Sequence, residues 1–278
     1  MFQKITGLKY LNTENMNILD KIVADKRREV ELKKSIFPVE QLENSILFQR
    51  SPVSLADKLR SSSSGIIAEH KRRSPSKSII NHDLNVQDVA SGYQDAGVCG
   101  MSVLTDGKYF GGSLEDLLYA RAVVEMPVLR KDFIVDDYQI LEAKAFGADV
   151  VLLIAAVLPT EELKRLATFA RNLGMDVLLE VHDLKELENS IEANVDMIGV
   201  NNRNLKTFEV SIENSKTLSK HIPDEFVKVS ESGISDPQVI AELQDYGYKG
   251  FLVGENFMRT EDPGKAARDF IKGINSKS

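Results

Sequence analysis

Eight short apolar runs, separated by longer amphipathic stretches, set the strongest limit on how this chain folds. The intervening stretches carry apolar residues at helical spacing, as in residues 139–147 and 161–170. Only a crossover of this length returns a chain to the same edge of a sheet, so the runs are predicted to be parallel strands. The predicted strands are Ile66–His70, Gly100–Leu104, Val128–Lys131, Val150–Ile154, Val177–Val181, Met197–Asn201, Val227–Glu231 and Phe251–Gly254.

Eight strand-and-helix units predict a (β/α)8 TIM barrel, with a doubly wound open sheet as the alternative. In a barrel the functional side chains gather at the carboxyl ends of the strands. Five of the eight predicted strands end in a charged or amide residue directly after an apolar run. These end residues are Glu69 with Lys71, Lys131, Glu180, Asn201 and Glu231. Their bias toward one end of the strands favours the barrel.

The chain ahead of the first strand is predicted to be helical. Residues 1–15 lack a pattern and are expected to be a leader, so Met16 is the expected start of the folded part. Apolar spacing predicts an amphipathic helix from Met16 to about Lys34, and prolines that suit a first helical turn predict short helices over 38–49 and 52–59. The serine-rich residues 61–65 are predicted to be a flexible joint. We therefore expect a helical extension over 16–64 and a barrel domain over 65–278.

Composition excludes several classes of protein. No apolar stretch is long enough for a membrane helix, and the N-terminus lacks a signal core and a cleavage site, so we expect a cytoplasmic protein. The single cysteine, Cys99, excludes an intrachain disulfide framework, and the four histidines lack metal-binding spacing, so no metal is predicted. The net charge of −7 disfavours nucleic acid, although Lys71–Arg73 is a candidate pocket for a small anion.

Two lysines and three carboxylates are predicted to share the mouth of the barrel. The strand period of two places Glu69 and Lys71 on one face, and Lys131, Glu180 and Glu231 end other strands. Neighbouring charges and burial shift pKa values in opposite directions, so such a mixture can supply an acid and a base at neutral pH. The alternative is a set of strand ends that simply emerge into water.

Two glycine-containing loops predict a phosphate site. Ser232-Gly233 follows the seventh strand and Gly254-Glu255 follows the eighth, and residues 255–258 have the length of a short extra helix. In many barrels these loops bind phosphate through backbone N–H groups and a helix dipole. The alternative is a pair of glycines used only for tight turns.

Polar and aromatic residues near other strand ends are further candidates for binding a small-molecule substrate. Asn201 suits a substrate hydroxyl, and Arg203 suits a carboxylate or phosphate. Tyr109 and Phe110 follow the second strand and Phe133 follows the third, where they are candidates for a pocket that holds an aromatic ring. Packing in the core is the equally weighted alternative for these aromatic residues.

Six motifs accompany the predicted strands. They are IAEHKRRSPS at 67–76, LTDGKYFGGS at 104–113, VLRKDFI at 128–134, LEVH at 179–182, IGVNNRNL at 198–205 and VSESGI at 229–234. In these motifs and their order the chain resembles the indole-3-glycerol phosphate synthase family of tryptophan biosynthesis. The resemblance runs from Met16 through nearly the whole chain.

The resemblance implies an enzyme that needs neither a metal nor an organic cofactor. It implies conversion of 1-(o-carboxyphenylamino)-1-deoxyribulose 5-phosphate into indole-3-glycerol phosphate by ring closure, decarboxylation and dehydration. Lys131 would be the general acid that protonates the substrate carbonyl oxygen. Lys71 would pair with the substrate carboxylate and act as an acid in the dehydration. Glu180 would be the base, and Glu69 would orient the lysines.

The resemblance also implies a set of substrate-binding residues and a cap over the mouth. The helix that begins at Met16 would help to cover the active site. Ser74 is expected to bind the substrate. The residues expected to position the sugar-phosphate chain are Asn201, Arg203, Glu231 and Ser232. Those expected to hold the phosphate are Gly233, Gly254 and Glu255. Those expected to form the anthranilate pocket are Phe110, Phe133 and Leu205.

The sequence departs from the family pattern at two positions and leaves other functions open. Ser78 stands where a glycine is usual, and His70 replaces an apolar or aromatic residue and is expected to point toward the helices. A second enzyme hypothesis makes Lys131 or Lys71 a Schiff-base nucleophile, as in class I aldolases. A third hypothesis is a barrel that only binds a phosphorylated metabolite. A monomer is the expected oligomeric state.

Overall fold

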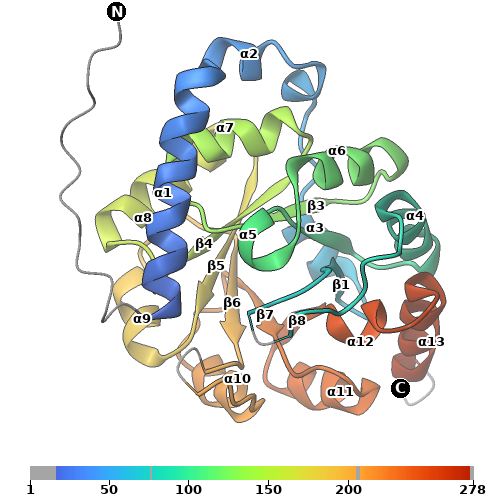
Figure 1. Ribbon diagram of the computed structural model, residues 1–278. Coiled ribbons are helices and arrows are strands. Elements are labelled where there is room, and N and C mark those ends of the chain that lie inside the picture. The colour runs from blue at the N-terminus through green and yellow to red at the C-terminus, as the bar shows by residue number, and fades with distance from the viewer. Residues whose placement is uncertain (1–16, 76, 205–206, 276–278) are drawn as a thin grey trace, which may run out of the picture.

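The computed structural model describes residues 17–75, 77–204 and 207–275. Its strands form a closed barrel in which every neighbouring pair is parallel, so the TIM barrel prediction is confirmed (Figure 1). The expectations for residues 1–15, Met16, Ser76 and Leu205 lie outside the described residues. The strands are β1 (Ile66–His70), β2 (Gly100–Leu104), β3 (Val128–Lys131), β4 (Val150–Ile154), β5 (Asp176–Val181), β6 (Met197–Asn201), β7 (Val227–Glu231) and β8 (Tyr248–Val253).

The last strand differs most from its predicted range. It begins at Tyr248 rather than Phe251 and ends at Val253, so Gly254 lies just beyond it. Lys249 and Gly250 interrupt the apolar pattern, although Tyr248 itself is fully buried. The apolar run therefore missed the half of the strand that pairs with the start of β7.

Helices alternate with the strands and surround them. None of the helices in the described part of the chain combines the length and hydrophobicity needed to cross a membrane. The helices are α1 (Ile18–Ile36), α2 (Val39–Glu43), the 3₁₀ helix η2 (Ile46–Gln49), α3 (Leu55–Ser61), α4 (Val86–Ala96), α5 (Gly107–Phe110), α6 (Leu114–Val123), α7 (Asp137–Ala145), α8 (Thr160–Asn172), α9 (Leu184–Ser190), α10 (Glu213–Ser219), α11 (Pro237–Asp245), α12 (Glu255–Met258) and α13 (Pro263–Asn275).

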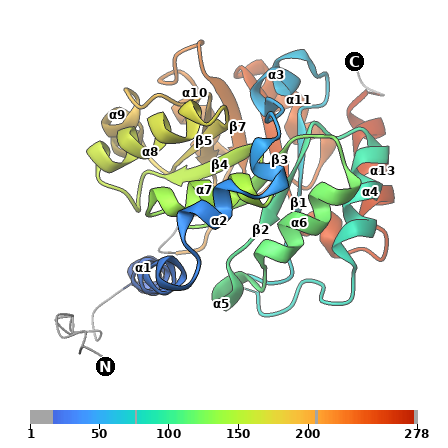
Figure 2. The same ribbon diagram turned by 90° about the horizontal axis from the view of Figure 1, so that it is seen from above.

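The barrel has an outer and an inner apolar core. The outer core lies between strands and helices, and the inner core lies inside the barrel. Leu55, Ala56 and Leu59 of α3 are fully buried in this inner core. Figure 2 places α3 at the end of the barrel opposite α1 and α5. Helix α3 therefore plugs the amino-terminal ends of the strands.

The serine-rich segment ahead of β1 is an ordered turn, so the prediction of a flexible joint is wrong. The Ser62 hydroxyl accepts hydrogen bonds from the N–H groups of Ser64 (3.2 Å) and Gly65 (3.0 Å), and both of these residues are buried. Gly65 has φ +64°, and a Cβ there would lie 2.1 Å from the carbonyl oxygen of Lys249. Glycine is required at position 65 because the β8 backbone leaves no room for a Cβ.

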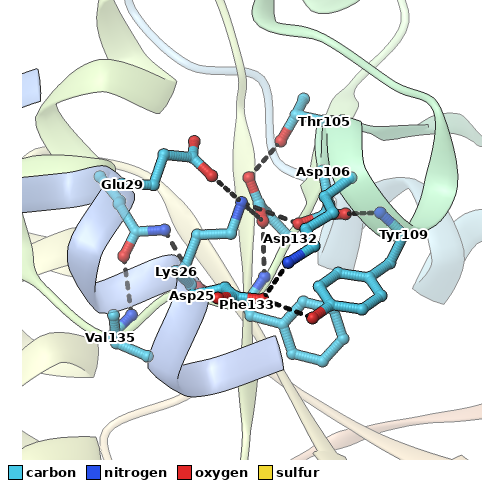
Figure 3. Close-up of polar contacts among 12 residues, drawn as sticks. Asp25, Lys26, Glu29, Thr105, Asp106, Tyr109, Asp132, Phe133 and Val135 are labelled. Carbon is cyan, nitrogen blue, oxygen red and sulfur yellow. Dashed lines mark hydrogen bonds and ion pairs between the residues drawn. The ribbon is translucent and has the colours of Figure 1, made fainter. Parts of the chain in front are cut away.

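Helix α1 lies at the mouth of the barrel and is held there by a buried lysine. Charged residues of an amphipathic helix normally face water, yet Lys26 is only 2% exposed. Its ammonium group lies 3.0 Å from Asp106 and 3.0 Å from Asp132, two carboxylates that follow β2 and β3 (Figure 3). At the rim, Asp25 accepts hydrogen bonds from Lys108 (2.6 Å) and Tyr109 (2.5 Å).

Lys26 belongs to a closed ring of ion pairs. The ring joins α1 to β3 and α7, and its charges alternate in sign, which limits the cost of burying them. Its contacts are Lys26–Glu29 (2.9 Å), Lys26–Asp132 (3.0 Å), Asp132–Arg130 (3.0 Å), Arg130–Glu142 (2.9 Å), Glu142–Lys33 (3.1 Å) and Lys33–Glu29 (3.1 Å).

The substitution Lys26→Met is expected to lower the free energy of unfolding by about 3 kcal/mol, because it leaves buried carboxylates without their counterion. Urea-induced unfolding measures this change. The matched control is Lys21→Met on the exposed face of the same helix, where the expected change is below about 0.5 kcal/mol. Equal effects of the two substitutions would contradict the role given to Lys26.

Candidate active site

A cavity of about 380 Å³ lies at the carboxyl ends of the strands. Ile18, Leu19 and Ile22 of α1 form part of its wall, so this helix covers the mouth as expected. All the site residues that the family resemblance implies within the described chain line this cavity. They are Glu69, Lys71, Ser74, Phe110, Phe133, Lys131, Glu180, Asn201, Arg203, Glu231, Ser232, Gly233, Gly254 and Glu255.

Lys131 at the end of β3 is the centre of the charged cluster. Its ammonium group lies 2.8 Å from Glu180 Oε2 on β5 and 2.6 Å from Glu231 Oε2 on β7. The Lys131 side chain is 12% exposed, and the two glutamates are less exposed still. Burial by itself lowers the pKa of Lys131, but Glu180 and Glu231 outweigh it and raise that pKa far above its usual range. Lys131 is therefore protonated at neutral pH.

The two glutamates that share Lys131 differ in their pKa values. Burial raises the pKa of Glu180, but the positive charges of Lys131 and His182 outweigh burial and lower this pKa to about 2. Burial raises the pKa of Glu231 to about 7, since Lys131 opposes the effect only in part and Glu180 adds to it. We assign the higher pKa to Glu231 because Glu180 has two cationic neighbours and Glu231 contacts only Lys131.

A second ion pair lies across the mouth. Lys71 Nζ lies 2.6 Å from Glu69 Oε1, as the spacing of these residues along β1 predicted. Two glycines make room for carboxylates of the site. A Cβ on Gly254 would lie 2.5 Å from Glu69 Oε1, and one on Gly199 would lie 2.3 Å from Glu231 Oε1. Gly254 thus has a role in seating Glu69, and Gly199 is a site residue that the sequence did not reveal.

His182 is a further residue of the cavity to which the sequence assigned no role. It follows Glu180 by two positions, so the strand period places both side chains on the mouth side of β5. Its Nε2 lies 3.3 Å from Glu180 Oε1, the carboxylate oxygen that does not contact Lys131. The spacing of Glu180 and His182 was the signal that could have found it.

The loops after β7 and β8 have the backbone shape expected of an anion site. Ser232 and Gly233 have consecutive positive φ angles of 69° and 77°. A Cβ on Gly233 would lie 2.5 Å from Val210, so only glycine fits there. The short helix α12 begins at Glu255, whose carboxylate lies 2.6 Å from Lys77 Nζ. Lys77 therefore adds a cation to this rim.

The loop after β6 is held by its own hydrogen bonds. Asn201 Oδ1 accepts from the Arg203 N–H (3.0 Å), and Arg203 donates to the carbonyl oxygen of Phe208 (3.3 Å). The neighbouring Asn202 turns into the protein, where its Nδ2 donates to the Ser230 hydroxyl (3.0 Å). Adjacent asparagines thus divide between the cavity and the support beneath it.

The structure places two of the three aromatic candidates in the cavity. Phe110 and Phe133 line the cavity with their ring centroids 6.0 Å apart. Tyr109 instead hydrogen-bonds to Asp25 of α1, so its predicted place in the pocket is wrong. Side chains of adjacent residues in α5 leave in different directions, and only one of the pair reaches the cavity.

The arginines of the predicted small-anion pocket have protein partners. Arg72 binds Asp116 and the Gly111 carbonyl oxygen (3.2 Å). Arg73 donates to the carbonyl oxygens of Gly107 (2.7 Å) and Lys108 (3.0 Å). Both residues therefore tie the loop after β1 to the loop after β2. Of the basic run, only Lys71 lines the cavity.

His70 lies in the core and does not line the cavity. His70 is 1% exposed, and burial together with Arg72 lowers its pKa to about 4, so it is a neutral residue of the core. In the described part of the chain, no cluster of three or more histidine, cysteine or acidic side chains is arranged to hold a metal ion.

Fold and site together define a TIM-barrel enzyme of acid–base chemistry with a loop pair suited to phosphate. Residues 19–270 match the family model described as indole-3-glycerol phosphate synthase. The chain belongs to the indole-3-glycerol phosphate synthase family. An indole-3-glycerol phosphate synthase from Bacteroides thetaiotaomicron is 49% identical over 93% of this chain and 99% of its own length. One from a Polaromonas species is 44% identical over 90% of this chain and 96% of its own length.

Solved structures support the fold alone. A thiamine phosphate pyrophosphorylase from Pyrococcus furiosus superimposes with a TM-score of 0.58 at 17% identity, over 80% of this chain and 98% of that one. At this identity the match shows a shared barrel and says nothing about the reaction.

The substitution Glu231→Gln is expected to stabilise the fold increasingly as pH rises from about 5 to 8. The folded-state pKa of Glu231, about 7, lies above its ordinary value of 4.5, so the folded protein loses stability relative to the unfolded chain as pH rises through this window. The full difference is about 3 kcal/mol. Urea unfolding of both proteins at several pH values measures it, and a difference that does not vary with pH would contradict the assignment.

Proposed function

We propose that this chain makes indole-3-glycerol phosphate from 1-(o-carboxyphenylamino)-1-deoxyribulose 5-phosphate, as a carboxy-lyase of tryptophan biosynthesis. Membership of the family supports the reaction. The observation that carries the assignment of roles is the buried Lys131 ammonium, held between Glu180 and Glu231 inside a single cavity.

Lys131 is the general acid of the ring closure. The ring carbon that bears the carboxylate attacks the C2 carbonyl carbon, and the carbonyl electron pair moves onto oxygen. That oxygen takes a proton from Lys131, which becomes a neutral amine. An oxygen that gains charge in a cavity with little water is stabilised strongly by a fixed ammonium group. Loss of CO2 then restores the aromatic ring.

Lys71 and Glu180 carry the dehydration. Lys71 pairs with the substrate carboxylate and then protonates the departing hydroxyl as its C–O bond breaks. Glu180 accepts the substrate proton that is lost in the same step, so that water leaves. Glu69 orients Lys71 for this role, because its carboxylate lies 2.6 Å from the Lys71 ammonium before the substrate binds.

The remaining cavity residues bind the ends of the substrate. Phe110 and Phe133 hold the anthranilate ring, together with Leu205, which lies outside the described residues. Consecutive positive φ angles and the start of α12 suit a phosphate group. The residues proposed to position the sugar-phosphate chain and the phosphate are Ser74, Asn201, Arg203, Glu231, Ser232, Gly233, Gly254 and Glu255.

The Schiff-base alternative is weaker for a physical reason. A lysine must be a neutral amine to attack a carbonyl carbon, and the raised pKa of Lys131 keeps it protonated. Borohydride trapping with a sugar phosphate tests the alternative, and we expect no covalent adduct. A cytoplasmic location and a monomeric state stay predictions.

The substitution Lys131→Ala is expected to lower turnover by about 10³-fold or more, because it removes the acid and the charge that stabilises the developing alkoxide. Fluorescence of the indole product measures turnover, and circular dichroism and substrate titration test the fold and binding, both of which should persist. Glu231 can take up a proton near neutral pH, so the loss of the ammonium leaves little uncompensated charge.

Lys164→Ala is the matched control, since Lys164 lies on α8 and pairs with Glu192 away from the cavity. Turnover of this variant should equal that of the unaltered chain. Near-normal turnover by Lys131→Ala would exclude Lys131 as the acid. Absence of turnover in the unaltered chain would exclude the proposed reaction.

A further inference from the structure

His182 occupies a place in the cavity that the acid and base roles leave unexplained. Its side chain is 10% exposed, and its Nε2 is a buried nitrogen that makes no hydrogen bond among the described residues. This nitrogen nevertheless lies 3.3 Å from Glu180 Oε1. Burying a polar atom that makes no hydrogen bond costs free energy unless a nearby charge compensates for it.

The other side of the imidazole ring is fixed by a carboxylate outside the cavity. Glu186 Oε2, on the first turns of α9, lies 3.2 Å from His182 Nδ1 and also accepts the His182 backbone N–H at 2.8 Å. From α10, Asn214 donates to the His182 carbonyl oxygen at 3.0 Å. The ring therefore has a set orientation, with Nδ1 toward Glu186 and Nε2 toward Glu180.

Glu180 consequently lies between two nitrogen groups that use different oxygens. Lys131 lies at Oε2 and His182 lies at Oε1. When Lys131 gives its proton to the substrate, its N–H bond breaks and its positive charge disappears. Glu180 then loses its ammonium counterion, whereas Glu231, whose pKa is raised to about 7, can take up a proton.

We propose that protonated His182 is a positioning residue for Glu180: held by Glu186, it keeps its second N–H against the free oxygen of that carboxylate while Lys131 is neutral. The proposal rests on the proposed function. It gives Glu180 a charge partner that lasts through the whole reaction, so the base is ionised and aimed when the dehydration needs it.

The charges around His182 favour its protonated form. It is faced by Glu180 from β5, Glu186 from α9 and Glu231 from β7, and Lys131 lies on the far side of Glu180. Burial lowers the pKa of His182, but the hydrogen bond to Glu186 and the charges of Glu180 and Glu186 outweigh it, so this pKa lies above its usual value. The imidazolium form is present below that pKa and is lost as pH rises through it.

Two substitutions separate a role for the charge from a role in packing. His182→Gln keeps a side-chain N–H donor without a positive charge. Glu186→Gln keeps an oxygen that can accept the His182 backbone N–H but removes the carboxylate that favours the imidazolium. Both full-length variants are compared with the unaltered chain by measuring kcat and KM between about pH 5.5 and 9.5.

We expect kcat of the unaltered chain to fall on the alkaline side as His182 loses its proton. This fall is the alkaline limb of the pH profile. His182→Gln should lower kcat about tenfold at pH values below the limb and should remove the limb itself, with KM changed less than about twofold. Glu186→Gln should keep the kcat of the acidic side and move the limb to lower pH. A loss of packing would lower kcat at every pH and would leave the limb in place.

Titration of the histidine ring by NMR tests the same charge without turnover. The His182 signal, assigned by its absence in His182→Gln, should titrate above about pH 6.5 and should shift lower in Glu186→Gln. If His182→Gln does not fold, the Glu186→Gln data decide. Titration at or below 6.5, or an unchanged limb in Glu186→Gln, would overturn the proposal. Lack of indole formation by the unaltered chain would instead overturn the proposed function.

Discussion

An excess of buried negative charge governs how this active site is built. Glu69 and Lys71 balance each other, but Glu180 and Glu231 share the single ammonium of Lys131. Adding a proton and placing a further positive charge beside a carboxylate are two ways to relieve such crowding. The protein uses both, since the pKa of Glu231 is raised to about 7 and the imidazole of the β5 loop lies against Glu180. The proposed acid and base chemistry at neutral pH depends on these charge interactions.

The end of β3 connects this cluster to the helix that covers it. Arg130, Lys131 and Asp132 are consecutive, and Lys131 is the one that reaches Glu180 and Glu231. Its two neighbours enter the ring of ion pairs that holds α1. The cap and the proposed acid are therefore fixed by adjacent residues of one strand end. A displacement of α1 acts on the strand that carries Lys131.

The fold and most of the cavity could be predicted because both follow from local pattern. Buried parallel strands are recognisable in a sequence as apolar runs. The strand ends of a barrel converge, so Glu69, Lys131 and Glu180 can be predicted to lie together without knowing any contact. Lys26 could not be placed in this way. Its partners lie far along the chain, and a lysine in an amphipathic helix normally faces water. Tyr109 was misplaced for the same reason, since its partner is on α1.

Helix α3 gives the chain an unusual order of assembly. It precedes every strand, yet its apolar side chains pack within the closed barrel, against β7 and β8 among others. Helix α3 is synthesised early, but it can bury its apolar side chains fully only after β7 and β8 have formed. Contacts between such distant segments slow folding. Whether residues 16–64 act as a separate unit stays a prediction. Removal of this extension would expose the part of the inner core that α3 covers. The extension therefore closes the barrel at the amino-terminal ends of its strands.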